Sequence, residues 1–243
     1  MSVTTSIKPY LQGSAQILYG SAPTGNTAVI TSAGGNYIQL PTSDPTNFDP
    51  STANVFVEAW VYWNGTATWN SPYGGSIYER HIGTTTQDWG PYVDNTGKLT
   101  AFMYTQNGSI LRPIYNSVLS IQTWYHVTFA YNTVNQTAYV WVNGNIGTSS
   151  TASNPARYTS SSLVTSIGSS PFNSNNYFWN GYIRDLRVIK GGIIPTTSFT
   201  PQAAPWALGA IPSYVTGGTN VFGLAAQYMQ QIPMYGQAPQ IYL

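Results

Sequence analysis

The stretch Val55-Phe-Val-Glu-Ala-Trp-Val-Tyr-Trp63 decides the fold class, because it alternates between two faces of an extended chain. Its apolar face carries Val55, Val57, Ala59 and Val61, and its other face carries Glu58, Trp60 and Tyr62. Bulky side chains on both faces are typical of a central strand that is covered from both sides in a layered sandwich.

Further runs rich in Val, Ile, Tyr, Trp and Thr, bounded by Gly, Asn, Pro or Ser, predict short strands along the chain. These runs are residues 28–40 (two strands around a hairpin-competent turn at 33–36), 98–105, 124–131, 137–142, 163–168 and 182–189. Asn143-Gly144 predicts a tight type I′ hairpin over residues 140–148, because both residues tolerate positive φ. No helical pattern alternates with these strands, so a parallel α/β sheet is not expected. The predicted fold class is all-β: an antiparallel two-sheet jelly-roll sandwich with extended N- and C-terminal arms.

The composition is unusual in its low charge. Only 6% of the residues are charged and the net charge is +1, against about 25% charged residues in ordinary globular proteins. Basic residues are scattered, which argues against nucleic acid as a partner, since phosphate contacts need clustered Lys and Arg. The absence of cysteine excludes disulfides and thiolate metal sites. No apolar run approaches the roughly 20 residues that span a bilayer, and no signal-peptide core follows Met1, so no membrane insertion is expected.

The two ends of the chain differ from its middle. Residues 191–243 contain no charged residue, and Lys8 is the only charge before Ser43. We predict an N-terminal arm over 1–27, the sandwich over 28–204 and a C-terminal arm over 205–243, in which 220–232 has helical spacing. An uncharged, apolar arm is expected to bury itself on its own sandwich or on a neighbouring subunit, and its prolines favour the neighbour. The candidate assembly residues are Trp206, Phe222, Tyr228, Met229, Tyr235 and Tyr242.

Four stretches together resemble the laminin G-like or concanavalin A-like jelly-roll family over about residues 28–190. They are Phe56-Val-Glu-Ala-Trp60-Val, Trp124-Tyr-His126-Val-Thr-Phe-Ala-Tyr131, Tyr139-Val-Trp-Val-Asn-Gly144 and Gly181-Tyr-Ile-Arg-Asp185-Leu-Arg-Val188. A narrower likeness follows them: Val188-Ile-Lys190-Gly191, Phe199-Thr-Pro201 and Ala204-Pro205 are similar to the closing segment of phage and other viral copies. The resemblance implies a domain that binds glycans or proteins, and the closing segment favours a virion protein.

Catalysis is not expected. Glycosidases of the resembling scaffold carry E-x-D-x-x-E along one strand, whereas here Glu58 is followed by Ala59 and Trp60. Glu79 and His81 have the spacing to share a strand face near Asp88, but an exposed loop or edge strand is the favoured interpretation. His126 stands where the family commonly has a histidine and is expected to be structural.

No cofactor or metal is expected either. The resemblance leaves Ca²⁺ as the alternative, because many family members bind it at a loop rim. The loop carboxylates available for it are Asp44, Asp49, Asp88 and Asp94. They are not clustered, and Ca²⁺ prefers several carboxylates among six to eight oxygen ligands.

Aromatic side chains in residues 63–92 form the candidate recognition surface, because the sequence predicts mostly loop in that stretch. The ligand-binding candidates are Trp63, Trp69, Tyr73, Trp89 and Tyr92. Such rings stack on the apolar faces of sugars, fill protein interfaces, or simply pack in the core, and all three interpretations stay open. Trp60, Trp124 and Trp141 are expected in the core.

Two functions therefore remain. The first is a non-enzymatic virion structural or decoration protein, displayed on the particle surface, whose arms dock on other virion subunits or on further copies of itself. The alternative is a lectin-like attachment module, virion-borne or extracellular, that holds a cell-surface glycan through its aromatic loops.

Overall fold

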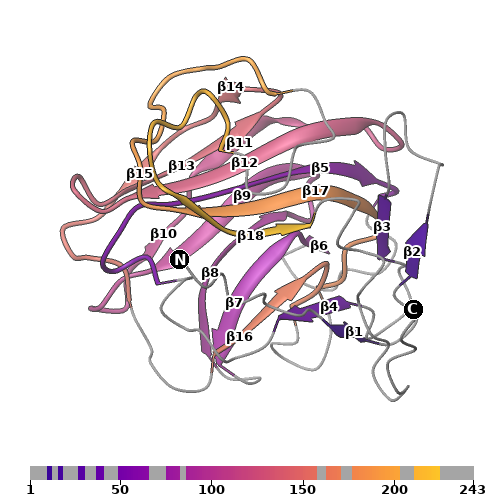
Figure 1. The fold of residues 1–243 in the computed structure, drawn as a ribbon, viewed down its shortest axis with the longest axis horizontal. Coiled ribbons are helices and arrows are strands. Elements are labelled where there is room, and N and C mark those ends of the chain that lie inside the picture. Colours follow the sequence, from indigo (N-terminus) through magenta and orange to yellow (C-terminus); the bar gives the residue numbers. More distant parts are fainter. Residues whose placement is uncertain are drawn as a thin grey trace, which may run out of the picture.

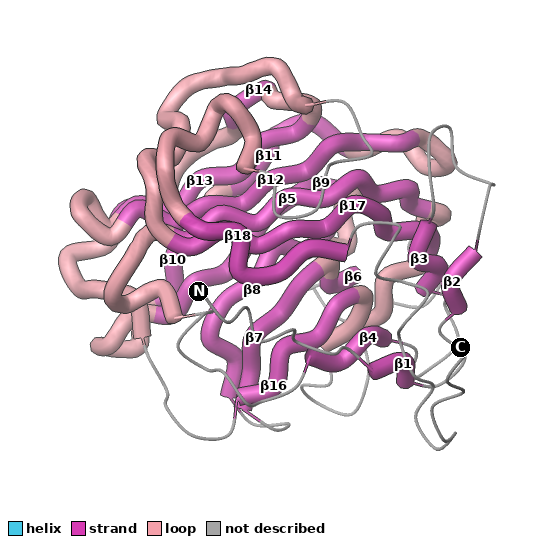
Figure 2. Tube along the Cα trace, viewed as in Figure 1, coloured by secondary structure: helices cyan, strands magenta, loops and turns pink. Residues whose placement is uncertain are grey.

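Two antiparallel sheets make up the computed structural model of the chain (Figure 1). The structure describes residues 10–12, 16–18, 27–30, 37–40, 49–65, 75–82, 86–157, 163–170, 177–202 and 211–224. These residues contain strands and loops but no helix, and the strands lie in two layers (Figure 2). The predicted fold class is confirmed.

We call the two layers sheet A and sheet B. Sheet A has the order β1 (Tyr10–Gln12), β4 (Tyr37–Leu40), β16 (Leu163–Ile167), β7 (Tyr78–Ile82), β8 (Thr86–Val93), β9 (Lys98–Tyr104) and β10 (Ile110–Leu111), with β11 (Ile114–Val118) on β9 and β6 (Gly75–Ser76) on β8. Sheet B has the order β14 (Asn145–Ile146), β13 (Thr137–Val142), β12 (Trp124–Asn132), β5 (Val55–Trp63), β17 (Gly181–Lys190), β3 (Thr27–Ile30) and β2 (Gln16–Leu18), with β15 (Ser150–Thr151) on β13 and β18 (Thr219–Leu224) on β17.

Strand β5 lies at the centre of sheet B, between β12 and β17. Its four predicted core residues are buried against Phe129 of β12 and Trp89 of sheet A, in the main core of the sandwich. Burying one aliphatic or aromatic side chain contributes about 1.5–3 kcal/mol to the free energy of unfolding. The many side chains of this main core therefore make it the main source of stability. The bounds predicted for β5 and β13 match the structure at both ends.

The predicted type I′ hairpin is confirmed between β13 and β14. Asn143 and Gly144 have φ values of 49° and 74°, the left-handed values that this turn requires. A Cβ on Gly144 would lie 1.8 Å from the carbonyl oxygen of Phe199, so only glycine fits there. The turn therefore also contacts the segment that follows β17, whose Phe199 amide donates a hydrogen bond to the Gly144 carbonyl.

Residues 28–40 do not form the predicted hairpin. Strand β3 pairs with β17 and β2 in sheet B, while β4 pairs with β1 and β16 in sheet A. The chain thus crosses from one layer to the other between the two strands. The residues of a turn are a local signal and do not determine which sheet each flanking strand joins. That choice depends on the free strand edges of β16 and β17, with which β4 and β3 pair.

The two predicted arms contribute strands to the sandwich. Residues 10–12 and 16–18 pair with β4 and β3, and Thr219–Leu224 pairs with β17 as strand β18. The helix predicted over 220–232 is therefore wrong for 220–224, and residues 225–232 lie outside the described part of the chain. Ladder hydrogen bonds along the open edge of β17 outweigh a weak local helical preference. Strand pairing extends past both predicted boundaries, at 28 and at 204.

Between β17 and β18, residues 193–202 and 211–216 pack on the outer face of sheet B. We call residues 193–216 the strap, of which 193–202 and 211–216 are described. Its side chains Ile194 and Val215 are buried in a second apolar core with Phe56 and Trp141. The ends of the strap meet where the amide of Ile193 donates 2.8 Å to the carbonyl of Thr216. This part of the uncharged C-terminal segment thus packs on its own sandwich, one of the two alternatives left open by the sequence.

Candidate binding surface

The outer face of sheet B is built from rows of three side chains across β12, β5 and β17. Strand register places Tyr62 directly between Trp124 and Tyr182, and in the next row Trp60 between His126 and Arg184. Side chains directly opposite one another on a sheet face contact each other, so each row acts as a unit.

The first of these rows, with Trp60 of the second, forms an aromatic platform: Trp60, Tyr62, Trp124 and Tyr182. The ring centroid of Tyr62 lies 5.5 Å from that of Trp124 and 5.3 Å from that of Tyr182. All four side chains are half-buried, whereas Trp89, Trp141 and Trp179 are completely buried. The platform therefore presents ring surface to solvent on a rigid scaffold.

Arg184 holds the rings of the platform together. Its guanidinium carbon lies 5.0 Å from the Trp124 ring centroid and 5.5 Å from that of Trp60, within the range of cation–π attraction. The side chain is nearly buried, with an exposed fraction of 4%. The surface that a ligand meets is consequently aromatic rather than charged.

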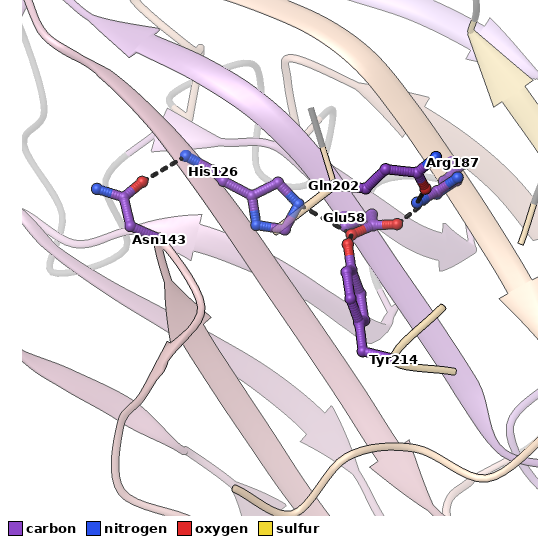
Figure 3. A network of polar contacts seen from close by, with 6 residues as sticks. All are labelled: Glu58, His126, Asn143, Arg187, Gln202 and Tyr214. Carbon is purple, nitrogen blue, oxygen red and sulfur yellow. Dashed lines mark hydrogen bonds and ion pairs between the residues drawn. The ribbon is translucent and has the colours of Figure 1, made fainter. Parts of the chain in front are cut away.

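A buried polar network surrounds the carboxylate of Glu58 (Figure 3). Glu58 lies on the outer face of β5, two residues before Trp60 of the platform. The Glu58 carboxylate contacts His126 Nε2 at 2.9 Å and accepts hydrogen bonds from Arg187 Nε and the Tyr214 hydroxyl. The Asn143 side chain accepts a bond of 2.9 Å from the His126 amide. His126 is thus a bonded, fully buried histidine, as predicted, and Glu58 joins three segments of the chain.

Tyr214 brings the strap into this network. Burial, and after it the neighbouring Glu58 carboxylate, raise the pKa of the Tyr214 hydroxyl above its usual range. The hydroxyl therefore stays protonated and donates to Glu58 throughout the physiological pH range. Arg187 also reaches the strap, since its Nη2 donates 3.2 Å to Gln202 Oε1.

A bulge in β17 sets Asp185 between the two arginines. The register shifts between Arg184 and Arg187, and Asp185 has a φ of 48°. Burial raises the pKa of the Asp185 carboxyl to about 6, while Arg184 and Arg187 act in the opposite direction. An acid whose folded pKa lies above its unfolded value of 3.8 contributes stability at low pH that is lost as the pH rises through 6.

Replacing Asp185 with Asn is accordingly expected to change how stability depends on pH. Asn tolerates the left-handed backbone at this position and cannot ionise. The unfolding free energy of D185N relative to the native chain should be higher at about pH 8 than at about pH 4.5, because the native carboxyl must ionise while buried. Urea unfolding at both pH values measures this, and an unchanged difference would contradict it.

The described residues predicted as loop ligands are core residues instead. Trp63, Trp89 and Tyr92 have exposed fractions of 4%, 0% and 5%. Trp89 stacks on Phe129 across the two sheets, at a centroid distance of 5.8 Å. The stretch expected to be mostly loop contains β7 and β8, and Trp63 lies at the end of β5, so the loop prediction is wrong and core packing is the one of the three interpretations that these rings follow. Trp69 and Tyr73 lie outside the described residues.

Glu79, His81 and Asp88 are not in an exposed loop either. They belong to β7 and β8 and are buried. Glu79 accepts a hydrogen bond of 2.7 Å from the Ser170 hydroxyl, and Asp88 accepts one of 3.1 Å from Arg157 Nε. These pairings give each carboxylate a structural partner.

The described residues give little support for the alternative of a Ca²⁺ site. Asp49 accepts a bond from the Ser51 amide, and the Asp94 carboxylate accepts three bonds from its own turn. Across the described part of the chain, no three His, Cys, Asp or Glu side chains gather as a metal site would require. Asp44 lies outside it.

Most candidate assembly residues also lie outside the described residues: Trp206, Tyr228, Met229, Tyr235 and Tyr242. Phe222 lies on β18, where it pairs with Val188. No helix in the described ranges is long and apolar enough to cross a membrane.

Sequence reasoning missed the platform. Trp60 and Trp124 were expected in the core, but they stand on the outer face of sheet B. The alternation of β5 already separated Trp60 and Tyr62 from the core valines. Trp124 and Tyr182 lie beside Tyr62 only because of the register of β12, β5 and β17. Register depends on tertiary structure, so the local sequence pattern did not reveal the platform.

Comparison with known proteins agrees with the fold. Among solved structures, the botulinum neurotoxin serotype G binding domain is similar with a TM-score of 0.53 at 15% identity, over 78% of this chain and 44% of that one. The binding domain of botulinum neurotoxin DC in complex with SialylT has a TM-score of 0.52 at 14% identity, over 75% of this chain and 42% of that one. The chain thus spans less than half the length of these structures, and the likeness concerns the fold alone.

No curated protein matches this sequence. The laminin G-type family described as the concanavalin A-like lectin/glucanases superfamily matches residues 32–193, which is more than half of the chain. The match covers β5, β12, β13 and β17, the strands on which the family resemblance was argued. The chain belongs to the concanavalin A-like lectin/glucanase superfamily.

Proposed function

We propose that this domain is a non-catalytic attachment module that holds a carbohydrate on the aromatic platform of sheet B. The observation that carries the proposal is the row Trp124–Tyr62–Tyr182, whose side chains are partly exposed on three adjacent strands. Aromatic rings stack on the apolar C–H faces of sugars, and their polar atoms orient the hydroxyls.

Three further observations support this proposal. The platform is preorganised by Arg184 and by ring contacts, so little freedom is lost when a ligand binds. Three carboxylates were considered as catalytic acids or bases: Glu58, Glu79 and Asp88. Each accepts a hydrogen bond from a donor within the fold, which favours binding over hydrolysis as the function. Relatives of the same fold include toxin binding domains, one of them in complex with SialylT.

Replacing Trp124 with Ala is expected to weaken glycan binding by about tenfold or more. The loss of one stacked ring removes about 1.5 kcal/mol or more of contact, and 1.4 kcal/mol corresponds to tenfold in Kd. A glycan array on the intact chain, followed by calorimetry with the best ligand, measures the change. W124F keeps a ring and should retain most of the affinity.

Val134→Ser provides the matched control, because Val134 is exposed in the turn that follows the far end of β12 from Trp124. It should leave binding unchanged. If W124A and V134S bind the glycan equally well, or if the native chain binds no glycan at all, the proposal fails.

The second candidate function is a virion structural or decoration protein, displayed on the particle surface. The supporting observation is the uncharged C-terminal segment, because its residues 193–202 and 211–224 already pack on or pair with sheet B. The remaining residues 225–243 keep the composition of a docking arm. On this hypothesis, removal of 225–243 alone should prevent incorporation into particles and leave the sandwich folded.

A further inference from the structure

A row of three amide side chains follows the aromatic row of the platform. Each amide stands two residues from one of the three rings, on the same three segments of sheet B: Gln122, Asn64 and Asn180. The backbone amide of Asn64 donates 2.8 Å to the carbonyl of Asn180, so the pairing of β5 with β17 continues one step past Trp63. Residues two apart in an extended strand share a face. The amide row therefore extends the face that carries the rings.

The backbone holds the amide row in place at the ends of the strands. The backbone amide of Gln122 donates 2.6 Å to the carbonyl of Trp63, and Asn180 Nδ2 donates 3.0 Å to the carbonyl of Gly65. The side chains of Asn64 and Gln122 are exposed, and that of Asn180 is half-buried. The row thus presents side-chain amides to solvent next to the rings, on positions fixed by main-chain hydrogen bonds.

The rings of the aromatic row converge toward one another. Neighbouring strands lie about 4.8 Å apart, so the backbones of Trp124 and Tyr182, two strands apart, are separated by roughly 9–10 Å. Their ring centroids are only 6.3 Å apart, with the ring planes at 24°. Each of these centroids also lies within 5.5 Å of that of Tyr62. The three rings therefore form a compact patch about as wide as one sugar ring, which suits a terminal residue better than the length of a polysaccharide.

The two rows contain no charged side chain. The nearby guanidinium of Arg184 has an exposed fraction of 4%, and its Nη1 lies 3.6 Å from the Asp185 carboxylate. A sugar carboxylate placed on the rings would lose water without gaining a charged partner in either row, which is costly. A side-chain amide both donates and accepts hydrogen bonds, as a sugar hydroxyl does. The chemistry of the two rows therefore favours a neutral sugar over an acidic one.

We propose that the platform and the amide row bind one neutral, terminal sugar residue, with its apolar face on the rings and its neighbouring hydroxyls on Asn64 and Gln122. This selectivity rests on the proposed function, because it concerns the same surface. The rings supply contact area that many sugars can use, whereas the amides distinguish sugars by the positions of their hydroxyls. A site built to hydrogen-bond a hydroxyl rejects an analogue that lacks it. Asn64, in the middle of the row, is thus a specificity-determining residue.

A glycan array on the intact chain tests the sugar class. The probes are oligosaccharides that end in a neutral hexose, each paired with the same oligosaccharide ending in the corresponding uronic acid. The neutral member should bind about tenfold or more tightly, because the acid would bring an uncompensated carboxylate to the rings. Binding of the neutral probes should change little with salt, since no ion pair forms. Lengthening the oligosaccharide behind its terminal residue should change Kd by no more than about threefold.

Asn64→Leu tests the role of the amide row. Leu has a similar shape but can neither donate nor accept, so N64L should bind the best neutral probe about tenfold more weakly. In a series of monodeoxy analogues of that probe, one analogue should bind the native chain equally weakly, and N64L should lose nothing further on it. A purely structural role of Asn64 would instead weaken the binding of every analogue. N116L is the matched control, because Asn116 is exposed on β11 of the other sheet, and it should bind as the native chain does.

The outcomes separate this selectivity from sugar binding itself. If the native chain binds no glycan, the proposed function fails and the selectivity fails with it. If W124A weakens binding but acidic probes bind best, the platform holds a sugar and the proposed selectivity is wrong. The same conclusion follows if N64L and N116L bind the neutral probe equally well. Urea unfolding of N64L at the native midpoint excludes a loss of fold as the cause of weaker binding.

Discussion

A chain that ends at residue 204 is expected to lose its cooperative fold, whereas a chain that ends at Leu224 should keep it. The shorter chain lacks Ile211, Tyr214 and Val215, which pack on the second core of sheet B. It also lacks β18, which pairs with β17 from Leu186 to Lys190. The outer face around Phe56 and Ile189 would then face water.

The expected loss is large compared with the stability of a domain. Each of the three missing side chains contributes about 1.5–3 kcal/mol when fully buried, and somewhat less when partly buried. Loss of the Tyr214 hydroxyl leaves a lone pair of the buried Glu58 carboxylate unsatisfied, at about 1–3 kcal/mol. Domains have only about 5–15 kcal/mol in total, so the sum is comparable with the whole stability.

Urea unfolding followed by tryptophan fluorescence and near-ultraviolet circular dichroism measures the difference. The chain ending at Leu224 is the matched control, because it keeps the strap and β18. If the chain ending at residue 204 unfolds at the same midpoint as this control, the strap does not stabilise the sandwich. The result also decides how the virion hypothesis must be tested, since a deletion from 205 would confuse misfolding with loss of assembly.

The sequence predicted what depends on local patterns. Alternation in Val55–Trp63 and the turn residues Asn143-Gly144 predicted β5, β13 and the hairpin, because period and turn chemistry are local. The same reasoning predicted the two strands within residues 28–40 but not the sheets that they join, and it failed for 220–224. Both stretches have ambiguous local signals, and their strands form because β16 and β17 offer unpaired edges.

The candidate site was less predictable than the fold, for a related reason. Residues 63–92 are rich in aromatic side chains, as the sequence shows, but Trp89 and Tyr92 lie on β8 with their rings buried in the core. Exposure is decided by which face of a strand a second layer covers. The platform needed the register of three strands whose residues run from Trp60 to Tyr182 along the chain.

Replacing Arg187 with Met is expected to destabilise the fold by about 3–5 kcal/mol. Arg187 is 1% exposed, and its Nε donates to Glu58, whose side chain is completely buried. Met fills similar volume but leaves the carboxylate with His126 and Tyr214 as its remaining donors. The cost arises mainly from a buried charge that loses its countercharge, rather than from lost packing.

A double-variant cycle separates these two causes. Adding Glu58→Gln to R187M removes the buried charge, so the pair should recover a large part of the lost stability, whereas a packing defect would persist. R112M is the matched single control, because Arg112 is exposed and should cost well under 1 kcal/mol. Urea unfolding of the four chains gives the coupling energy. Equal destabilisation by R187M with and without Glu58→Gln would show that the network holds the strap by shape and not by charge.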